Sequence, residues 1–518
     1  MVDQKKILLI VPPVIVTRDR ANFNLTFPIG LAYIAAVLEE ASYEVVILDT
    51  IAENVEQETP VKNNPDLIQI GMTFEEIKNF IAECSPDFIG ISSMFSTQSK
   101  NAYGVAEMVK SVNKGTPVIF GGAYATAEPE KVLENKNVDI VVLGEGEMAI
   151  APLLKAIENG NNLDTLESIA FRNSNNGIIL KPKIEFVDVD RLPYPARHLF
   201  QAEKYFTAGQ RHGIRKPKGV KYRSMPILTS RGCPFSCNFC SAYQLFGKKY
   251  RPRNVEDVLK EIDDMVKIYK VEDIYLSDDQ FLLDRKRVLR MLDGIIEKDY
   301  KIVFDAPNGI SPWLLNEEII RKMKQAGFWR VPLAIESGNK TVLKEMINKP
   351  VKINKLPELV SLLRKYKLDV MAFIVVGNFS EDAVETFSQI QDTFELMRKL
   401  KIRKPAISYI SPHPGSAIFE IARKKKYINK SYLDNYYNEP SFSTSNWNKE
   451  ELKIFTTVQR VLCVIDDNFL FLPIKILAKN FGGFCLMGRY RFIYNLYLIS
   501  KAIKRFYFNR VKTIFSPT

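Results

Sequence analysis

The chain has 518 residues, 46% of them hydrophobic and 25% charged, and its formal net charge at pH 7 is +12. This composition is that of a soluble globular protein with room for two or three domains. The sequence holds no apolar run of the ~20 residues that a membrane span needs, and Met1 is not followed by a signal-peptide hydrophobic region. We therefore expect a cytoplasmic protein. The positive net charge is as typical of a generally basic proteome as of a protein that binds nucleic acid or a membrane surface. We expect that the protein binds no nucleic acid.

Strands and helices alternate over residues 1–150. Short apolar runs that end in Gly, Ser or Pro predict the strands, and a run with helical spacing predicts a helix at 30–40. Such alternation predicts a doubly wound, Rossmann-like parallel sheet, which binds ligands at the carboxyl ends of its strands. No G-x-G-x-x-G follows the first strand, so a dinucleotide is not favoured. The expected strands are 6–11, 44–48, 88–92, 118–120 and 140–143.

Residues 151–225 look like a connector between two domains. Asn173-Ser-Asn-Asn-Gly177 is typical of a hairpin turn. The basic stretch from Arg211 to Arg223 fits either a solvated loop or a surface that receives an anionic substrate, and we favour the loop.

Strand–helix alternation returns over residues 226–415, with six expected strands. A polar residue or a glycine follows each strand, which is where parallel α/β barrels place their sites. The expected strands are 226–232, 273–277, 301–304, 331–335, 370–376 and 406–410.

Residues 416–518 are expected to be helical. Asn448 and Glu451 have the spacing of a capping box. The final segment carries an apolar helical stripe accompanied by basic residues, which fits a helix on an anionic membrane surface or one packed on the preceding domain; we favour packing. The stripe consists of Phe492, Leu496, Ile499, Ile503 and Phe506. Cys84, Cys463 and Cys485 are isolated and are expected in the core.

The other three of the six cysteines stand together in Cys233-Pro-Phe-Ser-Cys237-Asn-Phe-Cys240. Three thiols at the spacing C-x3-C-x2-C leave one unpaired if a disulfide forms, whereas they are good ligands for an iron–sulfur cluster. A four-iron cluster held by three cysteines has one iron free to bind another molecule. Zinc or unliganded buried thiols are the alternatives, and zinc sites usually add a second cysteine pair or histidines, which are absent nearby.

In this motif the chain resembles the radical S-adenosylmethionine (SAM) enzymes, whose signature is C-x3-C-x-aromatic-C, with Phe239 here as the aromatic residue. The resemblance implies that residues 226–415 form a partial (β/α)6 barrel of the TIM type. It also implies a [4Fe-4S] cluster on Cys233, Cys237 and Cys240 at the barrel mouth, with SAM on the open iron.

The resemblance further implies which strand ends contact SAM. Asp278 and Asp279 stand where the family often has Gly-Gly-Glu, a group that receives the methionine ammonium. Glu336 and Ser337 match a position near the ribose or amino group. Any one of these carboxylates alone is more often a loop solvator or a helix cap. The residues implied beside adenine are Phe239 and Gly377.

Residues 1–150 are similar to the cobalamin-binding domain that precedes many radical SAM barrels. The similarity implies cobalamin contacts at the strand ends. The implied residues are Ser92, Ser96, Gly121, Gly122, Gly144, Glu145 and Gly146. No histidine occurs in residues 1–150, since the three histidines are His198, His212 and His413. The domain would therefore supply no histidine to cobalt, and a scaffold domain without cobalamin is the alternative.

Together the resemblances imply a cobalamin-dependent radical SAM enzyme that methylates an unactivated carbon through a 5′-deoxyadenosyl radical and methylcobalamin. They assign no catalytic residue beyond the cluster ligands. The expected partners are a small-molecule substrate, with a lipid or isoprenoid as one class, and an electron donor such as flavodoxin or ferredoxin. The expected division is 1–150, 151–225, 226–415 and 416–518. An oxidative cyclase with the same cofactors and a non-enzymatic cobalamin or iron–sulfur sensor are the alternatives.

Overall fold

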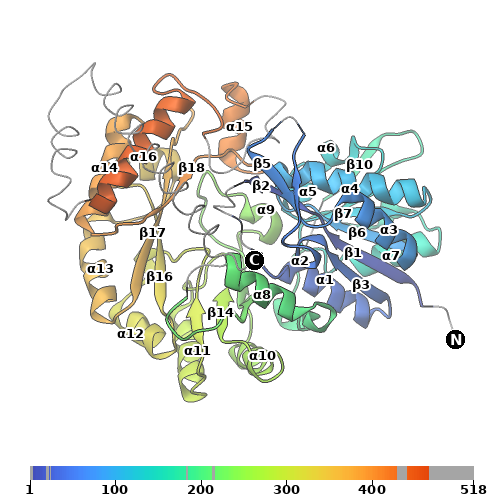
Figure 1. Cartoon of the computed structure of the whole chain (residues 1–518), viewed down its shortest axis with the longest axis horizontal. Coiled ribbons are helices and arrows are strands. Elements are labelled where there is room, and N and C mark those ends of the chain that lie inside the picture. Colours follow the sequence, from blue (N-terminus) through green and yellow to red (C-terminus); the bar gives the residue numbers. More distant parts are fainter. Residues whose placement is uncertain are drawn as a thin grey trace, which may run out of the picture.

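The computed structural model describes residues 4–18, 23, 25–62, 64–182, 185–212, 216–428 and 440–465. These residues form two halves, each built on parallel strands, that lie side by side (Figure 1). Within the described residues, no helix combines the length and apolar character that crossing a bilayer requires. The apolar stripe of 492–506 and Cys485 lie outside the described residues.

The first half is centred on a seven-stranded sheet with the order β10-β9-β8-β7-β6-β1-β3. Strands β3, β1, β6, β7 and β8 are parallel, and the chain changes direction across the sheet between β1 and β6. This confirms the predicted doubly wound sheet. The bounds are β1 Lys6–Val11, β3 Glu44–Asp49, β6 Phe88–Ser92, β7 Val118–Gly121, β8 Ile140–Val142, β9 Ile169–Arg172 and β10 Ile178–Lys181.

Helices cover both faces of this sheet. Apolar residues of α3 and α4, such as Ile77 and Val105, are buried on one face, and those of α1 and α7, such as Ala35 and Leu153, on the other. A small three-stranded sheet, β2-β5-β4, was not expected. The remaining bounds are α1 Ile29–Glu40, β2 Val14–Thr17, α2 Thr50–Glu53, β4 Glu58–Pro60, β5 Leu67–Ile70, α3 Phe74–Cys84, α4 Ser99–Val112, α5 Ala123–Ala127, α6 Pro129–Leu133 and α7 Ile150–Glu158.

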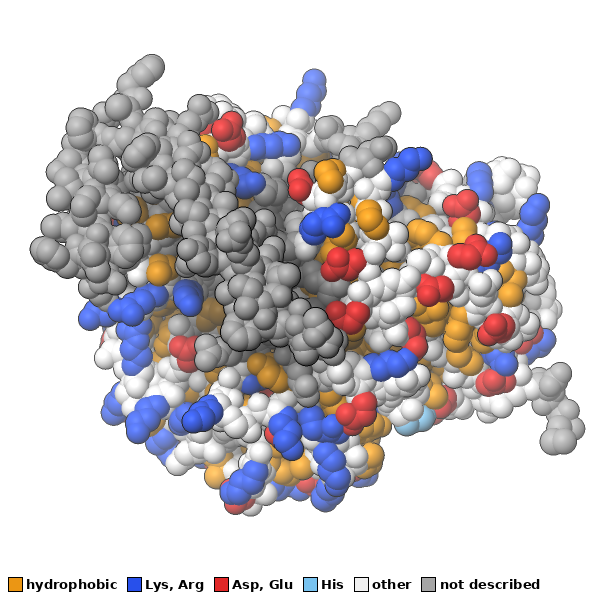
Figure 2. Space-filling model, in the orientation of Figure 1, with side chains coloured by type: hydrophobic (Ala, Val, Ile, Leu, Met, Phe, Trp, Pro, Cys, Tyr) orange, Lys and Arg blue, Asp and Glu red, His pale blue; other side chains and the backbone are white. Residues whose placement is uncertain are grey.

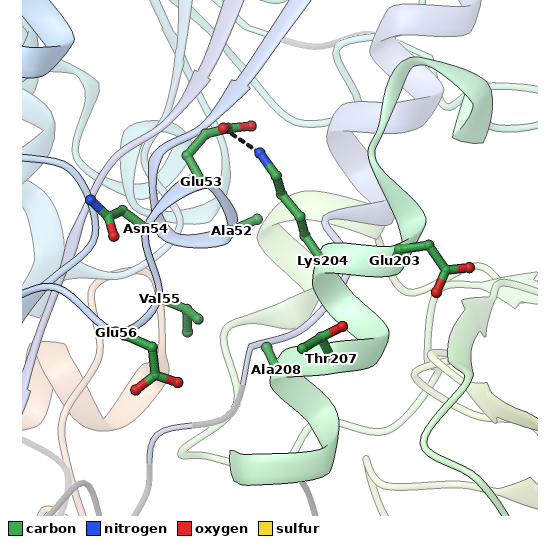
Figure 3. A pocket seen from close by; sticks show the side chains of 9 residues that line it. All are labelled: Ala52, Glu53, Asn54, Val55, Glu56, Glu203, Lys204, Thr207 and Ala208. Atoms are coloured by element: carbon green, nitrogen blue, oxygen red, sulfur yellow. Dashed lines mark hydrogen bonds and ion pairs between the residues drawn. The ribbon is translucent and has the colours of Figure 1, made fainter.

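The connector contributes to both halves. The predicted hairpin turn is present, with Asn173 N–H donating to Gly177 O at 2.9 Å, and the antiparallel strands β9 and β10 extend the first sheet beyond residue 150. Helix α8 (Ala202–His212) packs on α2, where Lys204 pairs with Glu53 beside a shallow cavity of about 340 Å³ (Figure 3). Arg197 pairs with buried Glu261 of the second half at 2.7 Å.

The second half is a partial barrel of six parallel strands. They form two three-stranded sheets, β11-β14-β15 and β16-β17-β18, joined by the parallel bridges Phe304↔Phe328 and Ile310↔Leu333. Helices surround the strands on the outside (Figure 1). The strand bounds are β11 Ser224–Ile227, β14 Asp273–Leu276, β15 Val303–Asp305, β16 Arg330–Glu336, β17 Asp369–Val376 and β18 Ala406–Tyr409. The helix bounds are α10 Val255–Lys267, α11 Arg285–Glu297, α12 Glu317–Gln325, α13 Leu356–Lys365, α14 Phe387–Lys399 and α15 Ala417–Lys424.

The described part of the C-terminal region packs against the barrel. Helix α16 (Lys449–Ile465) begins at the predicted capping box, in which Glu451 N–H donates to Asn448 Oδ1 at 2.9 Å and Asn448 N–H to Glu451 Oε2 at 3.1 Å. Phe455 packs against Phe387 of α14 with ring centroids 4.7 Å apart and the rings tilted by 37°. Cys463 is buried, as expected for a core cysteine, and Cys84 is half-buried. Basic and acidic side chains are mixed over the visible face, with more basic ones over the barrel helices (Figure 2).

Candidate active site

The three-cysteine motif lies on a loop at the carboxyl end of the first barrel strand. The expected strand 226–232 is split, because Thr229 N–H donates to Asp278 and the chain turns into a short strand β12 (Ser230–Arg231). Strand β12 pairs antiparallel with β13 (Arg251–Pro252), so the two strands close the base of a loop spanning 232–250. Helix α9 (Ala242–Phe246) lies inside this loop.

The three cysteines form no disulfide and are half-buried. Burial raises the pKa of all three and takes that of Cys237 to about 11, so deprotonation to the ligand form calls for a cation such as iron. Among the described residues, no three His, Cys, Asp or Glu side chains meet at a single-ion site. A four-iron cluster requires no such meeting, since each cysteine binds its own iron. The donor set therefore fits a cluster.

A one-turn π-helix, η6 (Val342–Ile347), anchors this loop on the side of Cys237 and Cys240. Asn238 donates through its N–H to Ile347 O and through Nδ2 to Met346 O, each at 2.9 Å. Phe239 packs against the apolar side chains of η6. Short π-helical segments are frequent at functional sites, and this one satisfies its last carbonyls on the cysteine loop.

The two adjacent aspartates after β14 have different surroundings. Asp278 is buried and accepts hydrogen bonds from Thr229 N–H at 2.7 Å and from the hydroxyls of Thr229 and Ser230 at 2.6 Å each. Its carboxylate thus holds the entry to the cysteine loop. Asp279 accepts a longer bond from Gly232 N–H at 3.3 Å and acts electrostatically on Cys233 and Cys240. Burial raises the pKa of Asp279 to about 6.

Glu336, at the end of β16, also faces the cysteines. Its backbone is left-handed, with φ +65°, next to a β-bulge between Ala334 and Glu336. A left-handed backbone conformation in a buried non-glycine residue is uncommon and is found most often at functional sites. Ser337 Oγ lies 3.1 Å from Thr393 Oγ1 of the outer helix α14 and accepts from Asn339 N–H, so this hydroxyl is engaged within the protein.

Sequence reasoning missed the cation of this site, Lys349. Its Nζ donates to Glu336 Oε1 at 2.5 Å, and both side chains are less than 10% exposed. Lys349 acts electrostatically on Cys233, Cys237 and Cys240. The only signal in the sequence was the opposite sign of its charge, 13 residues after Glu336, and nothing local pointed to the contact.

Gly377, at the end of β17, has φ +83°, and a Cβ there would meet Leu452 and Trp447 of the C-terminal region. The buried carboxylate of Glu385 accepts from Gly377 N–H at 2.7 Å and Asn378 N–H at 2.9 Å. The Glu385 Oε1 and Asn378 Oδ1 atoms have no hydrogen-bond partner among the described residues. Burial raises the pKa of Glu385 to about 7.

We expect Glu385→Gln to stabilise the protein in a pH-dependent way. The pKa of Glu385 rises on folding from 4.5 to about 7, so the stability that its protonation contributes is complete below pH 4.5 and lost as the pH passes 7. The neutral amide keeps an acceptor for the two N–H groups and adds a donor for Asn378. The gain of the variant in free energy of unfolding, measured by chemical denaturation at each pH, should grow between pH 5 and pH 8 toward about 3 kcal/mol. Glu385→Ala is the control, and it should be less stable than the wild type at both pH 5 and pH 8. A gain in stability of Glu385→Gln that does not depend on pH would contradict the prediction.

In the first half, the carboxyl ends of the strands face the cysteine loop. Ser92 ends β6 and is half-buried, and Ser96 is buried. The hydroxyls of Ser93 and Thr97, four residues apart, are buried and have no hydrogen-bond partner among the described residues. Buried polar groups are normally paired, so these two orphaned hydroxyls, one residue beyond the expected pair, fit a polar ligand inserted here.

Two further features of this edge fit a bound cobalamin. A Cβ at Gly121 would meet no atom within 4 Å, so the protein's own packing leaves space there, whereas Gly122 has φ +111° and a Cβ would lie 2.8 Å from Ser93 O. Large apolar side chains are exposed at the same strand ends, as a ligand with an apolar surface would require. They are Met94, Phe95 and Met148.

The loop after β8, Gly144 to Glu147, joins the two halves through buried ion pairs. Glu145 accepts from Arg231 at 3.2 Å and from Arg251 at 2.7 Å, and Glu147 accepts from Arg231 at 2.7 Å. Burial would lower the pKa of Arg231, but Glu147 and Glu145 outweigh it and raise the pKa. Because Arg231 and Arg251 face each other at the base of the cysteine loop, the loop is fixed directly to the first half.

The carboxylate of Glu145 is bound by groups of the protein itself. Besides the two arginines, it accepts from the backbone N–H of Val187 at 3.0 Å. The flanking Gly144 has φ +69° and donates its N–H to Thr126 Oγ1, while a Cβ at Gly146 would lie 2.9 Å from Ile34. The Glu145 side chain is thus engaged within the protein, and the exposed side chain next to this loop is that of Met148.

Two family models match the chain. The B12 binding domain matches residues 23–154, and the Radical SAM superfamily matches residues 227–410. Both matches lie on the two halves described above. The structure of the radical enzyme OxsB with aqua-cobalamin bound resembles the chain with a TM-score of 0.66 and 18% identity, covering 96% of this chain and 72% of that one.

Curated relatives cover most of the chain. Cytidylyl-2-hydroxyethylphosphonate methyltransferase of Streptomyces wedmorensis is 28% identical over 86% of this chain and 88% of its own. An uncharacterized methyltransferase of Pyrococcus horikoshii is 29% identical over 80% and 83%. An anaerobic magnesium-protoporphyrin IX monomethyl ester cyclase of Synechocystis is 23% identical over 95% and 93%. With a B12-binding domain, a radical SAM barrel and three cysteines on a loop held between them, the chain belongs to the cobalamin-binding radical SAM enzymes.

Proposed function

We propose that this enzyme transfers a methyl group to an unactivated carbon of a small molecule. The observation that carries the proposal is the joint between the halves, because the arginines at the base of the cysteine loop are held by Glu145 and Glu147 of the B12-binding half. The cluster site and the cobalamin site are thereby built as one reaction centre. Two methyltransferases that match 86% and 80% of the chain's length support it.

When bound, the cluster with SAM supplies a 5′-deoxyadenosyl radical, and methylcobalamin supplies the methyl group. In our proposal Cys233, Cys237 and Cys240 bind the cluster, and charged side chains orient SAM beside it. Lys349 is placed to pair with the methionine carboxylate, and Asp279 and Glu336 to pair with the ammonium. Asp278 holds the loop entry rather than SAM. Phe239, Ser337 and Gly377 shape the surrounding wall.

For cobalamin, we propose that Ser93 and Thr97 bind the polar tail together with Ser92 and Ser96. Their partnerless hydroxyls support this assignment. Gly121 and Gly122 would let the tail approach the backbone, and Gly144 and Gly146 keep the loop above it in place. In this proposal residues 1–150 are the cobalamin domain, 226–415 the barrel, 151–225 the connector and 416–518 a helical extension.

Anaerobic reconstitution with iron, sulfide and hydroxocobalamin, followed by SAM and a strong reductant, tests this function. We expect bound cobalamin, and 5′-deoxyadenosine formation that Cys237→Ala abolishes, because removing one of three cluster ligands prevents SAM cleavage. Cys84→Ala, a half-buried cysteine outside the loop, is the matched control and should keep both. Deoxyadenosine without bound cobalamin would contradict methyl transfer and leave the first domain as a scaffold.

The cyclase relative, which covers 95% of the chain, supports oxidative cyclisation as a second candidate. The product distinguishes the two, since methylation adds one carbon from SAM and cyclisation adds none. Deuterium from methyl-labelled SAM should therefore appear in the product only for the methyltransferase. A sensor without enzymatic activity would produce no 5′-deoxyadenosine.

Three parts of the proposal concern partners and location. The substrate is a small molecule, and a lipid or isoprenoid is one class that suits the basic, apolar C-terminal sequence. The reductant is a protein such as flavodoxin or ferredoxin. We place the enzyme in the cytoplasm, with peripheral membrane contact through residues 481–518 as a prediction from sequence alone.

A further inference from the structure

A surface cavity of about 510 Å³ lies directly outside the cysteine loop. One wall is Pro234 to Ser236, the residues between the first two cysteines, and Pro234 and Ser236 are exposed. The other wall is η6 and the residues flanking it. Asn348 Nδ2 donates to Ser236 O at 2.9 Å and so ties the two walls together. A molecule seated in this cavity would touch the loop that binds the cluster.

The cavity is basic. Lys340, Lys344 and Lys349 line it, and no Asp or Glu does. Lys349 is buried with Glu336, whereas Lys340 and Lys344 are exposed and form no ion pair within the described part of the chain. At the rim, exposed Lys248 donates to Ser236 Oγ at 3.1 Å.

The exposed lysines make this face attractive to an anionic partner. Glu345 is the one acidic residue between Lys340 and Lys349 and lies outside the cavity lining. Charges of one sign around a concave surface concentrate field lines and steer an oppositely charged partner.

We propose that this lysine-lined cavity is the docking site of an acidic one-electron carrier protein, a partner that the proposed function requires. Redox partners bind through small, transient interfaces in which charge complementarity sets the rate of association. Each docking event would transfer one electron, oxidising the carrier by one electron and reducing the bound cluster by one, with no bond made or broken. The wall at Pro234 to Ser236 lies between Cys233 and Cys237 in the chain, so a carrier seated in the cavity contacts the loop that carries the cysteines.

The test compares two reductants on Lys340→Glu/Lys344→Glu. A bacterial flavodoxin, kept reduced by its NADPH-dependent reductase, must dock, whereas reduced methyl viologen is a small cation that needs no docking surface. With flavodoxin at low ionic strength, we expect the rate of 5′-deoxyadenosine formation to fall more than about tenfold. With methyl viologen it should stay within about twofold of wild type. Added salt should lower the flavodoxin-dependent rate of 5′-deoxyadenosine formation by the wild type and should change that of the variant little.

Lys286→Glu/Lys399→Glu makes the same charge change at exposed positions on α11 and α14 and is the matched control. It should keep the wild-type rate with both reductants. An unchanged flavodoxin rate in Lys340→Glu/Lys344→Glu would overturn the docking site, and so would an equal loss with both reductants. Failure of the proposed function itself has a separate signature, since the wild type would then form no deoxyadenosine even with methyl viologen.

Discussion

Gly232→Ala should abolish cluster assembly while leaving the fold intact. Gly232 directly precedes Cys233 and has φ +84°, and a Cβ would lie 2.2 Å from the backbone oxygen of Lys249. No side-chain rotation relieves an overlap between a Cβ and a backbone atom. The strand before Gly232 is fixed by Arg231 and Asp278, so the strain must displace the start of the cysteine loop. Since a shifted Cys233 no longer completes the three-cysteine set, iron bound after reconstitution should fall more than about tenfold.

The matched control is Gly160→Ala. Gly160 also has a positive φ, +64°, but a Cβ there meets no atom within 4 Å, so the substitution costs only the backbone strain of about 1–2 kcal/mol. Iron content and 5′-deoxyadenosine formation should match the wild type. Far-UV circular dichroism and hydroxocobalamin binding report whether Gly232→Ala still folds. A Gly232→Ala protein that assembles its cluster and cleaves SAM at the wild-type rate would show that the loop adapts.

The alternation of apolar runs predicted both sheets because parallel strands buried on two faces are apolar along their whole length. Each of the six barrel strands overlaps its expected range, as does each of the five parallel strands of the first sheet. The sequence predicts the hairpin turn in the connector but not that its strands join this sheet. The pairing of the hairpin with β8 depends on tertiary contacts, which no local pattern encodes. The split of the first barrel strand was also missed, because it depends on Asp278, which lies 49 residues from Thr229.

The candidate site was predicted less completely, and the gaps have physical causes. Neighbouring residues at a strand end point in opposite directions, so sequence could not distinguish Asp278, held by Thr229 and Ser230, from Asp279 near the cysteines. The same offset separates Ser92 from Ser93, whose hydroxyl is the one without a partner. The joint of Glu145 with Arg231 links residues 86 positions apart, and no local pattern carries that information.

Lys349→Met should destabilise the protein by about 3–5 kcal/mol, because it leaves the buried carboxylate of Glu336 without its cation. Glu336→Gln alone leaves Lys349 buried and unpaired, with a loss of similar origin. The double variant Lys349→Met/Glu336→Gln removes both charges, so its loss should be smaller than the sum of the two single losses. Chemical denaturation of the wild type, the two single variants and the double variant measures the coupling free energy between Lys349 and Glu336. Additive losses would show that the 2.5 Å contact contributes little.

The same double variant separates stability from ligand binding. If Lys349 and Glu336 serve only to hold β16 to the segment after η6, regaining stability should also restore SAM binding to the reconstituted protein. We expect that it does not, because the charges that pair with the methionine carboxylate and ammonium are gone. The matched control is the buried pair Arg330–Asp305, which lies about 20 Å from Glu336 along β16 at 3.3 Å per residue. Arg330→Met/Asp305→Asn should lose stability by the same mechanism and keep the SAM affinity of the wild type. Equal SAM affinity in both double variants would make Lys349 a structural residue.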